Sequence, residues 1–166
     1  MITIEVSPQQ VQRAEKLYSF KALKGSITKG GSNIYGALGE IIIHDIYEEN
    51  GLSVDFNSTY DYDLIIDGYK VDVKSKKYTS KFIPKSNWNL NISNYNTTQK
   101  CDFYFFLGVS DDMKSACLYG YINPKDFYSE AIFNKKGDID PNGDGKWRFK
   151  DDCYNLKISK LEDFKY

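Results

Sequence analysis

The sequence is poor in arginine, histidine and cysteine, and each shortage excludes a kind of site. Only Arg13 and Arg148 are arginine, so contacts in which a guanidinium reads a guanine base should be scarce. The three cysteines are widely separated and form no CxxC or Cys/His cluster, which indicates neither a zinc site nor a disulfide framework. We therefore expect free, buried or half-buried thiols in a reducing compartment.

The sequence also shows neither the pattern of a signal peptide at residues 1–6 nor an apolar run of membrane-spanning length. Residues 1–6 do not have the charged start and the apolar stretch of a signal peptide. No apolar stretch approaches the roughly 20 residues that cross a membrane. We expect a cytoplasmic protein without membrane association, and its length predicts a single domain over residues 1–166.

The formal net charge is only −1, but the charges are unevenly distributed. Residues 69–100 contain seven lysines and one acidic residue, Asp72, a local net charge of +6. The seven are Lys70, Lys74, Lys76, Lys77, Lys81, Lys85 and Lys100. Such a run is either a solvated lysine-rich face or a basic surface on which a polyanion docks, and composition leaves both interpretations open.

Residues 60–77 have the pattern of a β-hairpin. Two alternating runs, 61–66 and 69–76, flank Asp67-Gly68, a pair that favours the tight turn of a hairpin because both residues accept positive φ. The turn sets the register and predicts one apolar face. Its facing pairs are Ile66 with Tyr69, Leu64 with Val71, and Tyr62 with Val73.

The opposite face of this hairpin is polar. The same register places Asp63 opposite Asp72 and Asp61 opposite Lys74. Facing residues lie only about 5 Å apart, so two carboxylates there repel each other unless a cation or a proton lies between them. The pattern predicts a metal site with Lys74 beside it; the alternative is an exposed, salt-bridged hairpin face.

A helix is predicted over residues 33–49. Gly36 and Gly39 lie inside it, and glycine in a helix indicates close approach of another backbone or of a ligand. Glu40 lies one turn after Gly36, and His44, the one histidine, lies one turn after Glu40. Glu40 is either a solvated carboxylate or a site residue, whereas we interpret His44 as a surface or half-buried residue.

The remaining periodicity predicts an α/β fold with a mixed central β-sheet flanked by helices. Ser7, Pro8 and Gln10 should start a helix through a capping box, and Gly25 should end it. A further helix is expected over residues 125–133, and further strands over residues 52–57, 88–92, 101–109, 116–122 and 154–158.

Three motifs in this order resemble the PD-(D/E)xK nuclease superfamily. They are GALGE at 36–40, Asp63 after the next strand, and DVK at 72–74. The superfamily has an acid on its first core helix, an acid on its second core strand and a D/E-x-K motif on its third. The resemblance covers about residues 32–109, and it departs at Tyr62, which stands where the namesake proline would be.

This resemblance implies a restriction-endonuclease-like core and a metal-dependent DNA endonuclease. It assigns Glu40, Asp63, Asp72 and the Val73 carbonyl as ligands of Mg²⁺ or Mn²⁺, which prefer oxygen. It assigns Lys74 to orient the attacking water. Alternatively, the chain is a catalytically silent nuclease-like module that binds nucleic acid or a protein.

The expected substrate is double-stranded or branched DNA, and a homodimer is expected because cutting both strands needs two active sites. We expect basic side chains along and after the third motif to contact the nucleic acid. They are Lys76, Lys77, Lys81 and Lys85.

A second acidic cluster, residues 138–144, resembles the first half of a calcium-binding EF-hand loop. The pattern fails further on, because position 8 is Gly145 and position 12 is Phe149. Asn, Asp, Pro and Gly also dominate ordinary turns, so we favour a turn before the last strand over a Ca²⁺ site that stabilises an interaction protein.

Overall fold

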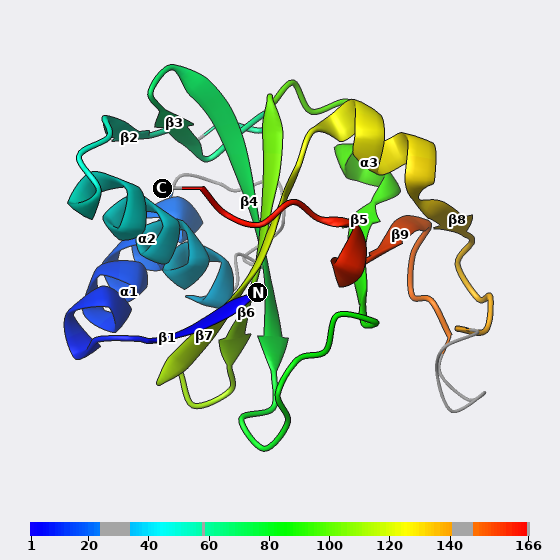
Figure 1. Cartoon of the computed structure of the whole chain (residues 1–166), viewed down its shortest axis with the longest axis horizontal. Helices are drawn as coiled ribbons and strands as arrows, with labels where there is room; N and C mark the ends of the chain where they lie inside the picture. Colours follow the sequence, from blue (N-terminus) through cyan, green and yellow to red (C-terminus); the bar gives the residue numbers. More distant parts are fainter. Residues whose placement is uncertain (24–33, 58, 141–147, 166) are drawn as a thin grey trace.

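The computed structural model describes residues 1–23, 34–57, 59–140 and 148–165. A six-stranded sheet runs through the middle, two helices cover one face, and a three-stranded sheet with a short helix covers the other (Figure 1). The predicted α/β architecture with a mixed central sheet flanked by helices is confirmed. None of the described helices has the length and apolar character needed to cross a membrane.

The central sheet has the strand order β1-β7-β6-β4-β3-β2. Its strands are β1 (Ile2–Glu5), β2 (Val54–Phe56), β3 (Leu64–Ile66), β4 (Tyr69–Tyr78), β6 (Phe103–Ser110) and β7 (Ser115–Ile122). β4 and β6 pair in parallel and the other neighbours pair antiparallel, so the sheet is mixed. The sequence did not predict β1, whose four residues are too few for a periodic signal.

Two helices, α1 (Pro8–Leu23) and α2 (Ile34–Glu49), form the layer on one face. The predicted capping box of α1 is confirmed: the Gln10 backbone N–H donates to Ser7 Oγ (3.2 Å), and the Ser7 N–H donates to Gln10 Oε1 (3.0 Å). The predicted end of this helix at Gly25 and the predicted first residue of the next helix, residue 33, lie outside the described residues.

The other layer contains β5 (Asn89–Ser93), β9 (Cys153–Lys157), β8 (Ile132–Asn134) and α3 (Pro124–Glu130). Short 3-10 helices, η1 (Asn94–Asn96) and η2 (Ile158–Lys160), follow β5 and β9. The prediction of one helix over 125–133 is wrong at its end. The chain becomes extended at Ala131 (φ −73°, ψ 145°), and Phe133 then pairs with Tyr154 of β9.

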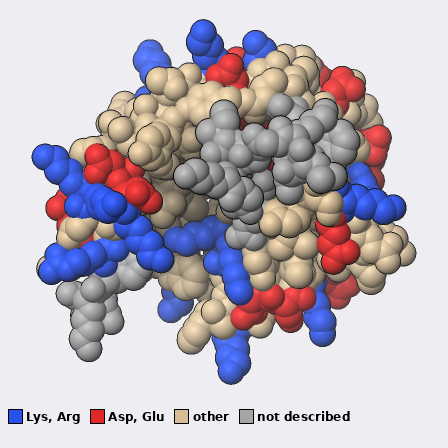
Figure 2. Space-filling view, turned by 180° about the vertical axis from the view of Figure 1, so that it is seen from behind, with Lys and Arg blue, Asp and Glu red and all other residues tan. Residues whose placement is uncertain are grey.

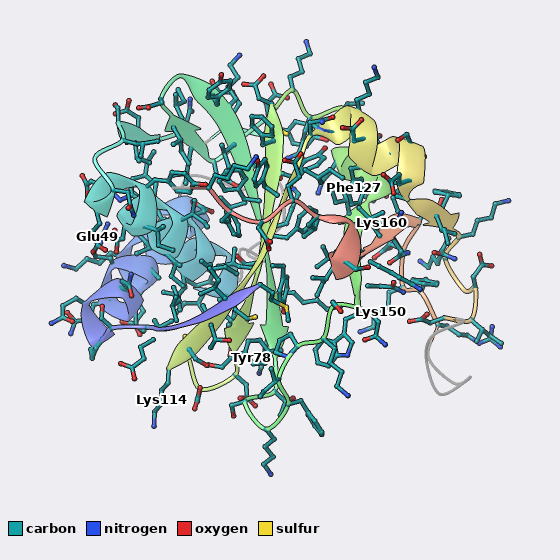
Figure 3. The ribbon with its side chains drawn as sticks, viewed as in Figure 1. Glu49, Tyr78, Lys114, Phe127, Lys150 and Lys160 are labelled. Carbon is teal, nitrogen blue, oxygen red and sulfur yellow. The ribbon has the colours of Figure 1, made fainter. Side chains whose placement is uncertain are left out.

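Each face of the central sheet has its own apolar core. Phe105 and Leu107 of β6 pack with α2 in one core, and Tyr104 and Phe106 of the same strand pack with Phe127 of α3 in the other (Figure 3). β6 is therefore buried on both faces, as its near-continuous apolar run predicts.

The hairpin forms with the predicted turn and register, but one arm is shorter. Asp67 (φ 47°) and Gly68 (φ 86°) both have positive φ, as a tight hairpin turn requires. Within the described residues 59–140, the β3–β4 ladder has three pairs: Leu64 with Val71, Ile65 with Lys70, and Ile66 with Tyr69. The pairs predicted beyond Leu64 are not part of this ladder: Tyr62 with Val73, Asp63 with Asp72, and Asp61 with Lys74.

The predicted apolar face of the hairpin is correct for four of its six residues. Leu64, Ile66, Val71 and Val73 are buried in the core beneath α2. Tyr69 is 58% exposed instead, and Tyr62 is half-buried. Both lie near an end of the paired region, where less of the molecule covers the sheet.

Candidate metal centre

Asp63 lies where the chain joins β3. Its backbone N–H donates to the carbonyl of Val71 (2.9 Å), and its carboxylate accepts a hydrogen bond from the backbone N–H of Val73 (Oδ2–N 2.9 Å). The carboxylate thus occupies the place of a strand carbonyl beside β4. A short acidic side chain competes with the ladder for backbone donors, which explains why Asp63 does not face Asp72 in register.

The Asp63 carboxylate is nevertheless close to the DVK motif. Val73, to which it is bonded, directly follows Asp72 in β4. The Val73 side chain is buried on the α2 face, as predicted, and by strand alternation Asp72 and Lys74 project to the opposite face. The Asp63 carboxylate at the edge of β4 and the Asp72 carboxylate on its face therefore lie on either side of the peptide that joins Asp72 to Val73.

Asp72 and Lys74 form a close, largely buried ion pair. Lys74 Nζ lies 2.5 Å from Asp72 Oδ2, and the side chains are 18% and 5% exposed. Lys74 Nζ also lies 5.7 Å from the centre of the Tyr104 ring, whose π-face attracts an ammonium group. Both groups are thus held in place before any ligand binds.

Gln99 joins the two residues and was not predicted from the sequence. Its side-chain nitrogen donates to Asp72 Oδ1 (3.0 Å) and to the Tyr60 carbonyl (2.7 Å), and its oxygen accepts from Lys74 Nζ (3.1 Å). Next to it, the Lys100 N–H donates to Asp61 Oδ1 (3.1 Å). The segment before β6 thus covers the ion pair of Asp72 and Lys74 and fixes its orientation.

Glu40 is buried in α2, and only 7% of it is exposed. The neighbouring Gly39 brings this helix against the sheet: a Cβ there would lie 1.7 Å from Ser75 Oγ of β4 and 3.3 Å from Leu107 Cδ2 of β6. Gly39 thus marks a close approach, but to the side chains of Ser75 and Leu107 rather than to another backbone or a ligand as predicted. Gly36 does not mark one among the described residues, none of which lies within 4 Å of such an atom.

Among the described residues, one group of three metal-ligating side chains has its ligand atoms within 4.8 Å of one another, and it is His44, Asp45 and Glu48. Glu40, Asp63 and Asp72 do not form such a closed group. His44 is buried rather than at the surface and stacks on Phe56 (4.5 Å between ring centres). Because Arg13 already holds both oxygens of Asp45 (2.7 and 2.9 Å), this group is best explained as a structural ion-pair network.

The surroundings of Asp72 disfavour further negative charge. Burial, followed by the charge of Asp72, raises the pKa of the Cys101 thiol to about 12. Burial also raises the pKa of Tyr104, whose hydroxyl lies 3.2 Å from that of Tyr128. Burial is the main cause of both shifts, so the neighbourhood of Asp72 is poorly solvated.

We expect Cys101 to resist alkylation. A thiol with a pKa of about 12 stays neutral throughout the range in which a free cysteine ionises, and only the thiolate reacts. At pH 8 iodoacetamide should therefore modify it about a thousandfold more slowly than a thiol with the ordinary pKa of 9.0. Peptide mapping by mass spectrometry measures this rate, with the unfolded protein as control. Equal rates in folded and unfolded protein would contradict the prediction.

The four lysines predicted to contact nucleic acid are exposed but are not gathered at Asp72. Lys76 shares the face of Asp72, whereas Lys77 lies on the other face with its Nζ 5.3 Å from the centre of the Tyr35 ring. Lys81 and Lys85 follow the end of β4, six residue steps or roughly 20 Å beyond Asp72. On the face seen in Figure 2, Lys and Arg side chains gather beside a hollow near the centre.

The acidic cluster at 138–144 is described only as far as Asp140. The Asp138 carboxylate accepts from the Lys135 N–H (2.8 Å), and its carbonyl accepts from the Phe149 N–H (3.0 Å). These contacts form a turn at the start of the acidic cluster, where the sequence predicts one. The rest of the EF-hand-like pattern lies outside the described residues.

No model of a known protein family matches the sequence, and neither does any curated protein. The geometry around Asp63, Asp72 and Lys74 is therefore the basis for the function proposed below.

Proposed function

We propose that the protein is a metal-dependent DNA endonuclease with a restriction-endonuclease-like core. One observation carries the proposal: Asp63 Oδ2 lies 2.9 Å from the amide nitrogen that follows Asp72, while Lys74 is paired with Asp72 on the same strand. Two carboxylates and an ammonium group from two chain segments thus meet at one end of β4. The order of these residues along the chain resembles that of PD-(D/E)xK nucleases.

The donor set fits a hard divalent cation. Asp63, Asp72 and the Val73 carbonyl supply oxygen and would hold Mg²⁺ or Mn²⁺. Glu40, which the resemblance assigns to the same site, lies in α2, on the side of the sheet opposite to the face from which Asp72 projects. When bound, such a cation neutralises the charge that develops on the phosphate as it is cleaved.

Lys74 is the residue that orients the attacking water. Its ammonium group is fixed by Asp72 and by Gln99 Oε1, so one of its three N–H donors can orient a water without large movement. Gln99 is a positioning residue, because it touches Asp72 and Lys74 rather than the substrate. Burial of the pair excludes bulk water, which strengthens each of these interactions.

The substrate of this endonuclease is double-stranded or branched DNA. Lys76 and Lys77 lie exposed along β4, where their ammonium groups are available to the phosphate backbone. Lysine positions phosphate as a point charge and reads no base sequence, which suits recognition of the shape of DNA. We further propose a homodimer, because cutting both strands requires two active sites.

A second candidate is a catalytically silent module that binds nucleic acid or a protein. The closed arrangement of Asp72 with Lys74 and Gln99 favours it, since both polar groups of the motif already have partners. In that case the ion pair serves to hold the segment before β6 against the sheet.

A cleavage assay together with a metal titration separates the two candidates. Purified protein with Mg²⁺ or Mn²⁺ should cut plasmid or branched DNA, chelation with EDTA should stop the reaction, and Mn²⁺ should raise the melting temperature because it binds the folded state. Linear and single-stranded DNA in the same assay define the substrate. DNA binding without any effect of metal would refute the nuclease and support the silent module.

A further inference from the structure

The loop that joins β4 to β5, residues 79–88, exposes two large apolar side chains at its tip. Phe82 is 63% exposed and Ile83 is 77% exposed. Tyr78 marks the end of β4 in Figure 3, and the loop projects below it, beyond both layers of the molecule (Figure 1). A partner surface that covered these two neighbouring side chains would remove their apolar area from water, which favours binding.

Hydrogen bonds hold this loop in a defined shape. The Phe82 N–H donates to the Thr79 carbonyl (2.9 Å), and the Ser80 N–H donates to Asp111 Oδ1 in the β6–β7 turn (2.9 Å). On its other side, the Ser159 N–H donates to the Ser86 carbonyl (2.8 Å). The apolar tip is therefore presented by a fixed frame, which lowers the entropy that a partner has to remove on binding.

The charges around the tip select an anionic partner. Lys81 and Lys85 flank Phe82 and Ile83, and residues 79–88 contain no acidic residue. The exposed Lys76 continues the positive charge on the Asp72 face of β4, whereas Lys77 lies on the other face over Tyr35. On the Asp72 face, Lys76 therefore lies between the apolar tip and the candidate metal centre.

We propose that this loop is a second DNA-binding element, in which Lys81 and Lys85 contact phosphates while Phe82 and Ile83 wedge into the minor groove and open a base step. The location of the wedge relative to the cut rests on the function proposed above. The roughly 20 Å along β4 corresponds to roughly six base pairs at 3.4 Å each, so the opened step lies at least that far from the cleaved phosphate. The positive charge of Lys76, which extends from the loop toward Asp72 on one face of β4, favours DNA over an anionic membrane as the partner.

Fluorescence anisotropy with a labelled duplex in EDTA tests this element without cleavage. The double variant Phe82→Ser/Ile83→Ser should raise the Kd about tenfold at an unchanged salt dependence, because it removes apolar contacts only. Lys81→Ala/Lys85→Ala should instead reduce the slope of log K against log salt by about 1.8, for two lost phosphate contacts. Ile132→Ser, which removes a side chain that is 68% exposed on β8, is the matched control and should leave the Kd unchanged.

A duplex carrying 2-aminopurine, which brightens when its stacking is lost, reports the wedge directly. Wild-type protein should raise its fluorescence at one position, and Phe82→Ser/Ile83→Ser should abolish the rise. A Kd for the double variant equal to that of Ile132→Ser would overturn the inference, as would Phe82- and Ile83-dependent binding to phosphatidylserine vesicles with unchanged DNA affinity. If the protein binds DNA through Phe82 and Ile83 but cuts no substrate, the proposed nuclease function is refuted and the DNA-binding loop is not.

Discussion

Asp72→Asn should lower the rate of Mg²⁺-dependent DNA cleavage by at least about a thousandfold, because it removes a charged oxygen ligand from the centre of the site. DNA affinity should stay the same or rise, since the change removes a negative charge that repels phosphate. Asparagine keeps the shape of the side chain and an oxygen that can accept from Gln99. Plasmid nicking measures the rate, and anisotropy without metal measures the affinity.

Asp55→Asn is the matched control for this variant. Asp55 is an exposed carboxylate of β2 in the same sheet, so its loss changes the net charge equally without touching the site. Thermal unfolding of both variants shows whether the fold survives, which matters because Lys74 loses its buried partner. Undiminished nicking by a folded Asp72→Asn protein would sink the nuclease proposal.

Two glycines of α2 should respond to alanine with opposite signs. Gly39→Ala should destabilise the protein by about 2 kcal/mol, because the new Cβ would lie 1.7 Å from Ser75 Oγ and 3.0 Å from Ser75 Cβ. Gly36→Ala should stabilise it by up to about 1 kcal/mol, because no atom of the described part of the chain lies within 4 Å of the new Cβ and alanine is the better helix former. In a domain of this size the melting temperature should fall by about 4–8 °C and rise by about 2–4 °C, respectively.

A substitution of Ser75 tests whether its side chain causes the destabilisation expected for Gly39→Ala. Its hydroxyl is buried and has no hydrogen-bond partner among the described residues, so Ser75→Ala alone should cost little. In the double variant with Gly39→Ala it removes the nearest clashing atom and should restore part of the lost stability. Equal melting temperatures for Gly39→Ala and Gly36→Ala would show that α2 does not pack against β4 as closely as described.

The elements that the sequence predicted well are those with local signals. The Asp67-Gly68 turn fixes three cross-strand pairs through positive φ alone, and Ser7 and Gln10 mark a helix start within four residues. The run at 101–109 identifies β6 because a strand buried on both faces needs no alternation. In each case the chemistry that decides the structure lies within a few residues.

The candidate site was predictable only in part, because its other contacts are long-range. The spacing of two residues places Asp72 and Lys74 on one face of β4. Gln99, 27 residues from Asp72, meets it only after the chain has passed through β5, and a lone glutamine carries no signal for that contact. Asp63 lies beside β4 but accepts from the Val73 N–H instead of facing Asp72 as predicted, since periodicity cannot show a side chain that replaces a backbone acceptor.

The double burial of β6 has a consequence for how the molecule unfolds. Its alternate side chains belong to two different cores, so neither the helical layer nor the layer of β5, β9 and α3 can detach without exposing one face of the same strand. The two layers are thus coupled into one cooperative unit, in which the amides of β6 are released to hydrogen exchange last. Asp72 of β4 pairs with Tyr104 of β6, so the candidate site lies on the strand next to the one whose amides we expect to exchange last.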